Sequence, residues 1–190
     1  MEGTDIQQID TDNTHNHTYF GNGGNNQVTV AGPTNLTTTY DNEGQSIGTY
    51  YNFQAATSGT GATVSTANAN SPDTFCPLGW QLPYSGKGGD YYDQSRSWNY
   101  LLATYGIDTA IDDETQTQKF RSYPFSVIYA GNYNWETGTL AYFQVHTLLH
   151  ASTVSGVNGS YQMYAWEKKI SANANNSKLY GNAVRCVTRK

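Results

Sequence analysis

The feature that most constrains this chain is a short segment, residues 71–83, with the sequence SPDTFCPLGWQLP. Pro77 and Pro83 fix their own φ angles and donate no amide hydrogen bond, so the segment is neither a helix interior nor a central strand. A rigid turn of this kind is expected to direct the large apolar side chains of Trp80 and Leu82 inward. The segment therefore predicts a corner around which a domain is organised.

The same segment contains Cys76, one of only two cysteines in the chain; the other is Cys186. Two cysteines so far apart do not make a metal site, and two buried free thiols are one interpretation. The other is a disulfide that closes a loop of about 110 residues and stabilises the fold by ~4–5 kcal/mol on the chain-entropy model. We favour the disulfide because a surface rich in Tyr, Asn and Thr and poor in charge is typical of extracellular proteins.

Composition restricts the partners that such a chain could bind. The 190 residues suit one domain, and only 13% of them are charged, against roughly a quarter in an average domain. With a net charge of −5 and no basic patch, binding to nucleic acid or to an anionic membrane is not expected. No apolar run approaches the ~20 residues of a membrane span, so no direct membrane insertion is predicted. The 16 Tyr and 4 Trp residues favour recognition surfaces instead.

Residues 1–26 are predicted to be a polar N-terminal segment, and residues 27–190 a single domain. Two places could bind a metal ion. His15 and His17 are spaced to chelate one from an extended chain, and the acidic residues 108–114 have oxygens suited to calcium. A solvated tail and an exposed acidic turn are the favoured interpretations, so we predict no metal and no cofactor.

One helix has a clear periodic pattern. In residues 94–105, apolar side chains recur at helical spacing: Trp98, Leu101, Leu102 and Tyr105. Asp93 is suited to begin this helix and Gly106 to end it.

Most of the remaining pattern indicates short strands. We expect strands at 27–31, 125–129, 140–149, 161–170 and 183–187, and loops at 131–138 and 171–178. In 140–149, alternation predicts that Val145 faces the core and His146 faces out. Asn158-Gly159 indicates a hairpin turn. The predicted fold class is α+β, mainly short antiparallel strands with one or two helices and long loops.

Four motifs in order resemble a known family. They are YYNF with two alanines (50–56), CPLGWQLP (76–83), a helix with Trp98 and Leu101, and GNAVRCV (181–187). The chain resembles, over residues 40–189, the Fibrobacter succinogenes major paralogous domain. The resemblance implies a C-type-lectin-like fold, a bridged cysteine pair and a bacterial protein that is extracellular or at the cell surface. Gln81 departs from the family, which often has Arg there, and residues 148–153 replace its common Tyr-Trp-Ser-Ser segment.

No catalytic constellation is evident, and we predict that the chain is not an enzyme. His146 or His150 could be combined with a serine, but no nucleophile elbow is present. Glu136 and Glu167 are the only carboxylates near aromatic residues that a glycosidase could use. The related formylglycine-generating enzymes bind copper through cysteines, whereas both cysteines here are explained by a bridge.

The leading functional hypothesis is a non-catalytic binding or adhesion module that recognises a host- or cell-surface glycan or protein, here expected as a monomer. Aromatic rings would stack on the ligand and amides would orient it. The candidate residues are Asn132, Tyr133, Asn134, Trp135, Tyr142, Tyr164 and Trp166. The alternative is that about half of the aromatic ones, with Trp166 as an example, pack in the core, because a domain of this size needs large apolar residues.

Two alternatives stay open. A charge-poor Tyr/Asn surface also suits a structural subunit of a pilus or surface layer, which sedimentation would detect as self-association. C-type-lectin-like domains also include hypervariable receptors diversified by retroelements, and the Asn-rich stretch 158–182 is compatible with that role. A neighbouring reverse transcriptase gene and an imperfect template repeat would identify it.

Overall fold

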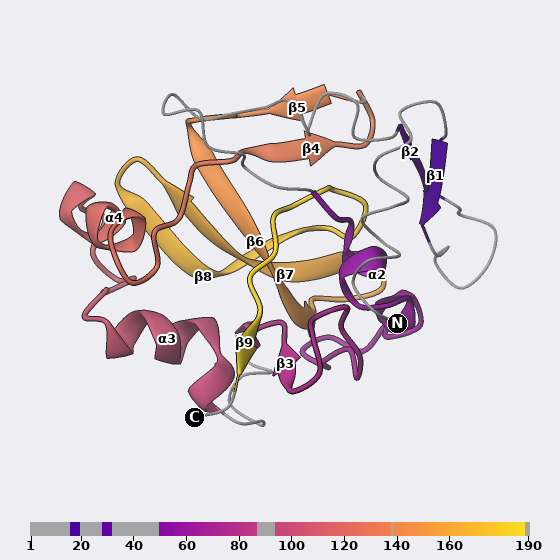
Figure 1. The fold of residues 1–190 in the computed structure, drawn as a ribbon, viewed down its shortest axis with the longest axis horizontal. Helices are drawn as coiled ribbons and strands as arrows, with labels where there is room; N and C mark the ends of the chain where they lie inside the picture. Colours follow the sequence, from indigo (N-terminus) through magenta and orange to yellow (C-terminus); the bar gives the residue numbers. More distant parts are fainter. Residues whose placement is uncertain (1–15, 20–27, 32–49, 87–93, 138, 189–190) are drawn as a thin grey trace.

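The computed structural model describes residues 16–19, 28–31, 50–86, 94–137 and 139–188, and it has an α+β architecture with antiparallel sheets (Figure 1). The elements in chain order are β1 (Asn16–Tyr19), β2 (Val28–Ala31), α2 (Phe53–Ala56), η1 (Thr60–Ala62), β3 (Trp80–Gln81), η3 (Gln94–Arg96), α3 (Trp98–Thr104), α4 (Glu114–Arg121), β4 (Asn132–Asn134), β5 (Thr139–Ala141), β6 (His146–Val154), β7 (Gly159–Trp166), β8 (Lys169–Ser177) and β9 (Val187–Thr188).

The largest sheet has the antiparallel order β6-β7-β8. The predicted hairpin is confirmed, because β6 and β7 pair on either side of the turn that contains Asn158. The loop expected at 171–178 is wrong: most of it is strand β8, paired with β7. Ile170 and Ala172 of β8 are buried. Pairing with β7 supplies backbone hydrogen bonds to a segment whose Asn-rich composition resembles a loop.

The main core lies between this sheet and α3 and α4, which Figure 1 places beside the strands. The predicted helix is confirmed as η3 followed by α3, but its N-cap is Ser97, whose side chain accepts from the Tyr100 amide. Gly106 follows with a φ of +68°, as a helix-ending glycine does. Trp98 and Leu102 are fully buried. The core residues are Trp98, Leu102, Ile107, Phe120, Phe125, Val127, Tyr129, Leu149, Ala151, Met163, Ala165, Ile170 and Ala172.

The segment after α3 differs from the prediction. Asp113, at the end of the acidic stretch, caps α4 by accepting from the Thr115 amide, so a second helix begins there. Residues 125–129 were expected to form a strand, which is wrong, although Phe125, Val127 and Tyr129 are buried alternately. The alternating burial of these side chains results from their packing in the core and not from a strand. The Val127 amide donates to the Phe120 carbonyl at the end of α4.

The proline-flanked corner is closed as predicted. Cys76 and Cys186 form a disulfide, and β3 pairs antiparallel with β9 beside it. Leu82 is buried against α2, in a small second core. The prediction for Trp80 is wrong: its side chain is 48% exposed. In a regular strand, Trp80 and Leu82 would point to the same side, because successive side chains alternate. The strand ends at Gln81, so this rule does not extend to Leu82. Leu82 is therefore buried while Trp80 is exposed.

The strand expected at 27–31 is observed as β2, which pairs with β1. β1 lies within the segment 1–26 that the composition describes as polar, and it contains His17. His15 and Asp93 lie outside the described residues.

Acid is expected to destabilise this fold through His150. The ring is fully buried on β6, Nε2 donates to the Tyr51 carbonyl at 2.7 Å, and burial lowers the pKa to about 4. An unfolded chain takes up that proton near pH 6.5, so it binds more protons than the folded state between pH 6.5 and 4. We expect the free energy of unfolding to fall by on the order of 3 kcal/mol across this window.

Urea unfolding at pH 6.5 and pH 4 measures this loss. A His150→Gln variant should show a much smaller difference between the two pH values, because the residue no longer titrates. If the free energy of unfolding falls equally between pH 6.5 and pH 4 in the variant and the wild type, other groups cause the acid sensitivity.

Candidate functional site

A tight turn between β5 and β6 builds the candidate site. Residues 140–149 were expected to form one strand, but the chain leaves β5, which pairs with β4, and joins β6, which pairs with β7. Tyr142 and Gln144 adopt positive φ angles of 57° and 63° in this turn. The Tyr142 carbonyl accepts from the Val145 amide at 3.0 Å and the His146 amide at 3.2 Å. The turn reverses the predicted faces, so that Val145 is exposed and His146 is buried.

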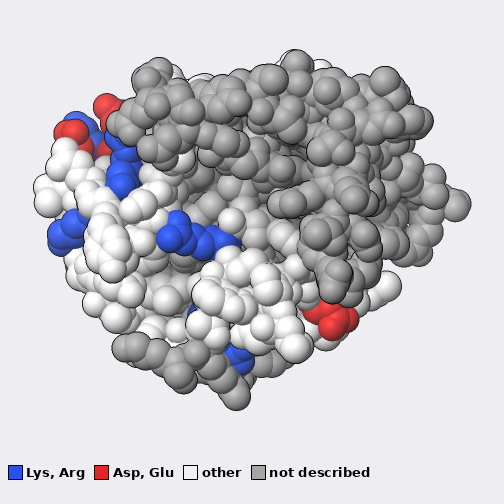
Figure 2. Space-filling view, viewed as in Figure 1, with Lys and Arg blue, Asp and Glu red and all other residues white. Residues whose placement is uncertain are grey.

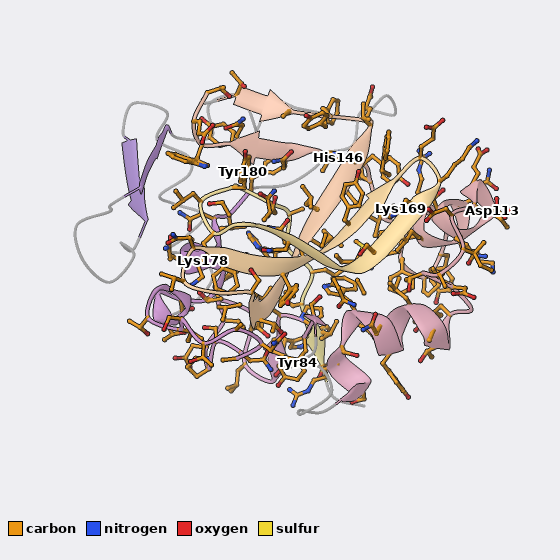
Figure 3. All side chains as sticks on the ribbon, turned by 180° about the vertical axis from the view of Figure 1, so that it is seen from behind. Tyr84, Asp113, His146, Lys169, Lys178 and Tyr180 are labelled. Carbon is orange, nitrogen blue, oxygen red and sulfur yellow. A yellow bond between two sulfur atoms is a disulfide. The ribbon has the colours of Figure 1, made fainter. Side chains whose placement is uncertain are left out.

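Three aromatic rings meet at this turn. The His146 ring centroid lies 4.5 Å from that of Tyr142 and 5.4 Å from that of Tyr164 on β7. The His146 Nε2 atom lies 3.3 Å from the Asn132 Oδ1 atom on β4. Trp166 pairs across the strands with His146. Figure 3 shows His146 where the start of β6 meets the β4–β5 hairpin. We call Tyr142, His146, Tyr164 and Trp166 the aromatic surface.

The rings of the aromatic surface are themselves uncharged at neutral pH. Burial lowers the pKa of His146, so its imidazole is uncharged at neutral pH. Burial also raises the pKa of Tyr164, with Tyr129 and Tyr142 adding to the effect. In Figure 2, uncharged residues predominate on the described surface, and charged side chains gather at the upper left around α4. The rings of the aromatic surface therefore offer neutral ring faces and hydrogen-bonding groups to a ligand.

An open cavity of about 370 Å³ adjoins the aromatic surface, between α4 and the end of β7. The Arg121 guanidinium carbon lies 4.9 Å from the centroid of the Tyr129 ring. The Thr117 hydroxyl donates to the Glu167 carbonyl at 2.7 Å, which joins α4 to the β7–β8 turn. The cavity is lined by Glu114, Thr117, Gln118, Arg121, Tyr129, Gln144, Val145, Trp166 and Glu167. Ring faces, an amide and charged groups of both signs are thus available beside Trp166.

The structure brings together only part of the predicted set. Tyr142 and Trp166 are 62% and 45% exposed, and Tyr164 is half-buried next to them. Asn132 and Tyr133 are buried, so the alternative that part of the candidate set lies in the interior holds for them. The Tyr133 amide donates to the Gly181 carbonyl at 2.7 Å, so β4 is held against the C-terminal segment and its side chains are covered.

Asn134 and Trp135 lie at the other end of the β4–β5 hairpin from Tyr142. The Asn134 Oδ1 atom accepts from the Glu136 amide at 2.9 Å and so shapes the hairpin turn. Trp135 is partly exposed at that turn. These two residues form a separate feature from the aromatic surface.

Sequence reasoning missed several residues of the site. His146 was assigned to a solvated face, because the alternating pattern gave no sign of the turn before it. Arg121 and Thr117 belong to α4, which was not predicted. A capping signal was available in the sequence, since Asp113 precedes Glu114 and an eight-residue helix follows.

Potential metal ligands do not gather in the described ranges. No group of three or more His, Cys, Asp or Glu side chains there could hold a metal ion. In that same part of the chain, no helix is both long and apolar enough to span a bilayer. His150 is committed to the Tyr51 carbonyl in the interior.

The fold and the site define a disulfide-bridged α+β domain with an aromatic surface at one end of its central sheet. No protein-family model, curated protein or solved structure matches the chain.

Proposed function

We propose that this chain is a non-catalytic binding module of the bacterial cell surface, with a C-type-lectin-like fold, that recognises a glycan or a protein. The observation that carries the proposal is the aromatic surface, where the exposed Tyr142 ring lies against a buried, uncharged His146 and the exposed Trp166 is its cross-strand partner. A half-exposed ring on a rigid strand loses little conformational entropy when it binds, so it suits recognition.

The positions of the family-like motifs support membership of the Fibrobacter succinogenes major paralogous domain family. The Tyr51 and Asn182 backbones exchange hydrogen bonds of 3.0 and 2.9 Å, which joins the first motif to the last. Asn52 caps α2 through the Ala55 amide at 2.8 Å. The disulfide then joins the second motif to the last, and Trp98 of the third fills the core. Four motifs in one structural unit are expected of a shared fold.

The disulfide supports an extracellular location, because such bonds persist in oxidising compartments. The cavity beside Trp166 supports binding of a polar ligand rather than a purely apolar one. Arg121 and Glu167 offer a donor and an acceptor there, and the adjacent rings offer apolar faces. This combination is typical of sites that stack a ring on one side of a ligand and hydrogen-bond its edge.

Replacing Tyr142 and Trp166 together by alanine is expected to weaken binding to a glycan array or to whole cells about fivefold or more, since two ring contacts of ~0.5–1.5 kcal/mol each are lost. The melting temperature should change little, because both side chains are exposed. Tyr123→Ala is the matched control, as Tyr123 is an exposed ring outside this surface.

A third variant, Trp135→Ala, separates the hairpin turn from the aromatic surface. If it alone abolishes binding, the ligand site lies at the β4–β5 turn and the aromatic surface is not the site. Unchanged binding by the double variant to every ligand of the wild type would contradict the proposal.

A further inference from the structure

A second cavity lies at the proline-flanked corner, far from the aromatic surface. Its volume is about 460 Å³. Figure 3 shows Tyr84, one of its lining residues, on the opposite side of the molecule from His146. The cavity is lined by Asn70, Ser71, Pro72, Asp73, Thr74, Cys76, Leu78, Gly79, Trp80, Gln81, Tyr84 and Ser152. Leu78 is completely exposed and Trp80 is half-exposed, so both are available to a ligand.

The Gln81 amide has its orientation fixed by its neighbours. Its Oε1 atom accepts from the Arg96 guanidinium, which can only donate, and from the Tyr84 hydroxyl at 3.4 Å. These two donors identify which end of the amide is the oxygen, so the opposite end is the Nε2 group, which can only donate. Within the described residues, this buried Nε2 group has no hydrogen-bond partner.

Asn70 is fixed by a similar chain of bonds. The Ser85 amide donates to the Thr153 hydroxyl at 3.0 Å, and that hydroxyl donates onward to the Asn70 Oδ1 atom. The Asn70 Nδ2 group is buried and, in the part of the chain that is described, has no partner. The same holds for the hydroxyl of Ser152, whose side chain is almost completely buried.

Three residues that line this cavity, Asn70, Gln81 and Ser152, thus each carry a buried polar group without a partner among the described residues, and Trp80 lines the same cavity. A buried donor without an acceptor costs free energy that a ligand oxygen would recover. The Asp73 carboxylate on the same cavity accepts hydrogen bonds and disfavours an anionic ligand. Hydroxyl groups both donate and accept, and a sugar ring has an apolar face that can stack on an aromatic ring.

We propose that this cavity is a metal-independent saccharide subsite, in which Trp80 stacks on a sugar ring while the Asn70 and Gln81 amides donate to its oxygens. It is separate from the aromatic surface and does not depend on the function proposed for that surface. Its ligand would be a neutral sugar residue, free or in a glycan chain.

The test is a titration of the ¹⁵N-labelled protein with maltotriose, cellotriose, chitotriose and mannotriose, followed by NMR. The four tryptophan indole signals report separately on each ring, and buried Trp98 serves as an internal reference. At least one trisaccharide should shift the Trp80 indole signal together with the side-chain amide signals of Gln81 and Asn70.

Gln81→Glu is the decisive variant, because a carboxylate still accepts from Arg96 but has no amide donor. It should weaken trisaccharide binding about tenfold or more, and Trp80→Ala should abolish it. Tyr100→Ala is the control, since its ring is 49% exposed on α3 and does not line the cavity.

The alanine variant of Tyr142 and Trp166 should titrate like the wild type at Trp80, which separates failure of this proposal from failure of the function proposed above. Two results would overturn the saccharide subsite: no shift at Trp80 with any of the four sugars, or wild-type affinity in Gln81→Glu. A shift confined to the Trp166 signal would also overturn it and would favour the aromatic surface.

Discussion

Replacing both Cys76 and Cys186 by alanine is expected to lower the free energy of unfolding by about 4 kcal/mol. The bridge spans 110 residues and joins the proline-flanked corner to the C-terminal segment. The strands beside it, β3 and β9, pair over two residues each, so strand pairing joins these segments over a short stretch. Without the bridge, the unfolded chain gains the conformational freedom that a long closed loop removes.

Urea unfolding of the double variant measures this loss, and the wild type in a reducing agent provides the control. Reduction should bring the wild type to the stability of the variant and leave the variant unchanged. A double variant within about 1 kcal/mol of the wild type would show that packing around Leu82 closes the corner without the bridge.

Trp98→Ala is expected to lower the free energy of unfolding by about 3–5 kcal/mol. The indole is fully buried at the start of α3, in the core that the helix shares with β6, β7 and β8. Alanine would remove most of the helix's buried apolar surface and leave a cavity that the rigid sheet cannot close.

Trp98→Phe is the matched comparison. Among the described residues, the buried indole nitrogen has no hydrogen-bond partner, so its removal breaks no bond. We expect phenylalanine to cost less than half as much as alanine, as judged by thermal and urea unfolding. Equal losses for the two variants would indicate that the indole nitrogen is paired.

The motifs of the sequence predict the scaffold well for a physical reason. Asn52, Trp98 and Leu82 act through a cap, a core contact and a corner, all of which depend on the residue type and its near neighbours. The hairpin at Asn158 is local in the same way. None of these residues belongs to the aromatic surface. A family resemblance based on them therefore predicts the fold but not the ligand.

The candidate site was harder to predict because it depends on contacts between distant segments. Tyr133 has the composition of an exposed loop residue, yet its pairing with Gly181 covers it. Trp80 was predicted to lie in the core, yet strand β3 ends at Gln81 and Trp80 lines a cavity at the surface instead.

By itself, the sequence determined the α+β class, the disulfide partner, the main helix and the central hairpin, because turn chemistry, periodicity and the presence of only two cysteines are local or unique features. Only the tertiary structure decided which rings face outward. In a strand, side chains alternate between the two faces of the sheet every two residues. This alternation stops at the turn through Tyr142 and Gln144, where the chain passes from one sheet to another. Exposure beyond that point is set by which strands pair, and strand pairing is a long-range property.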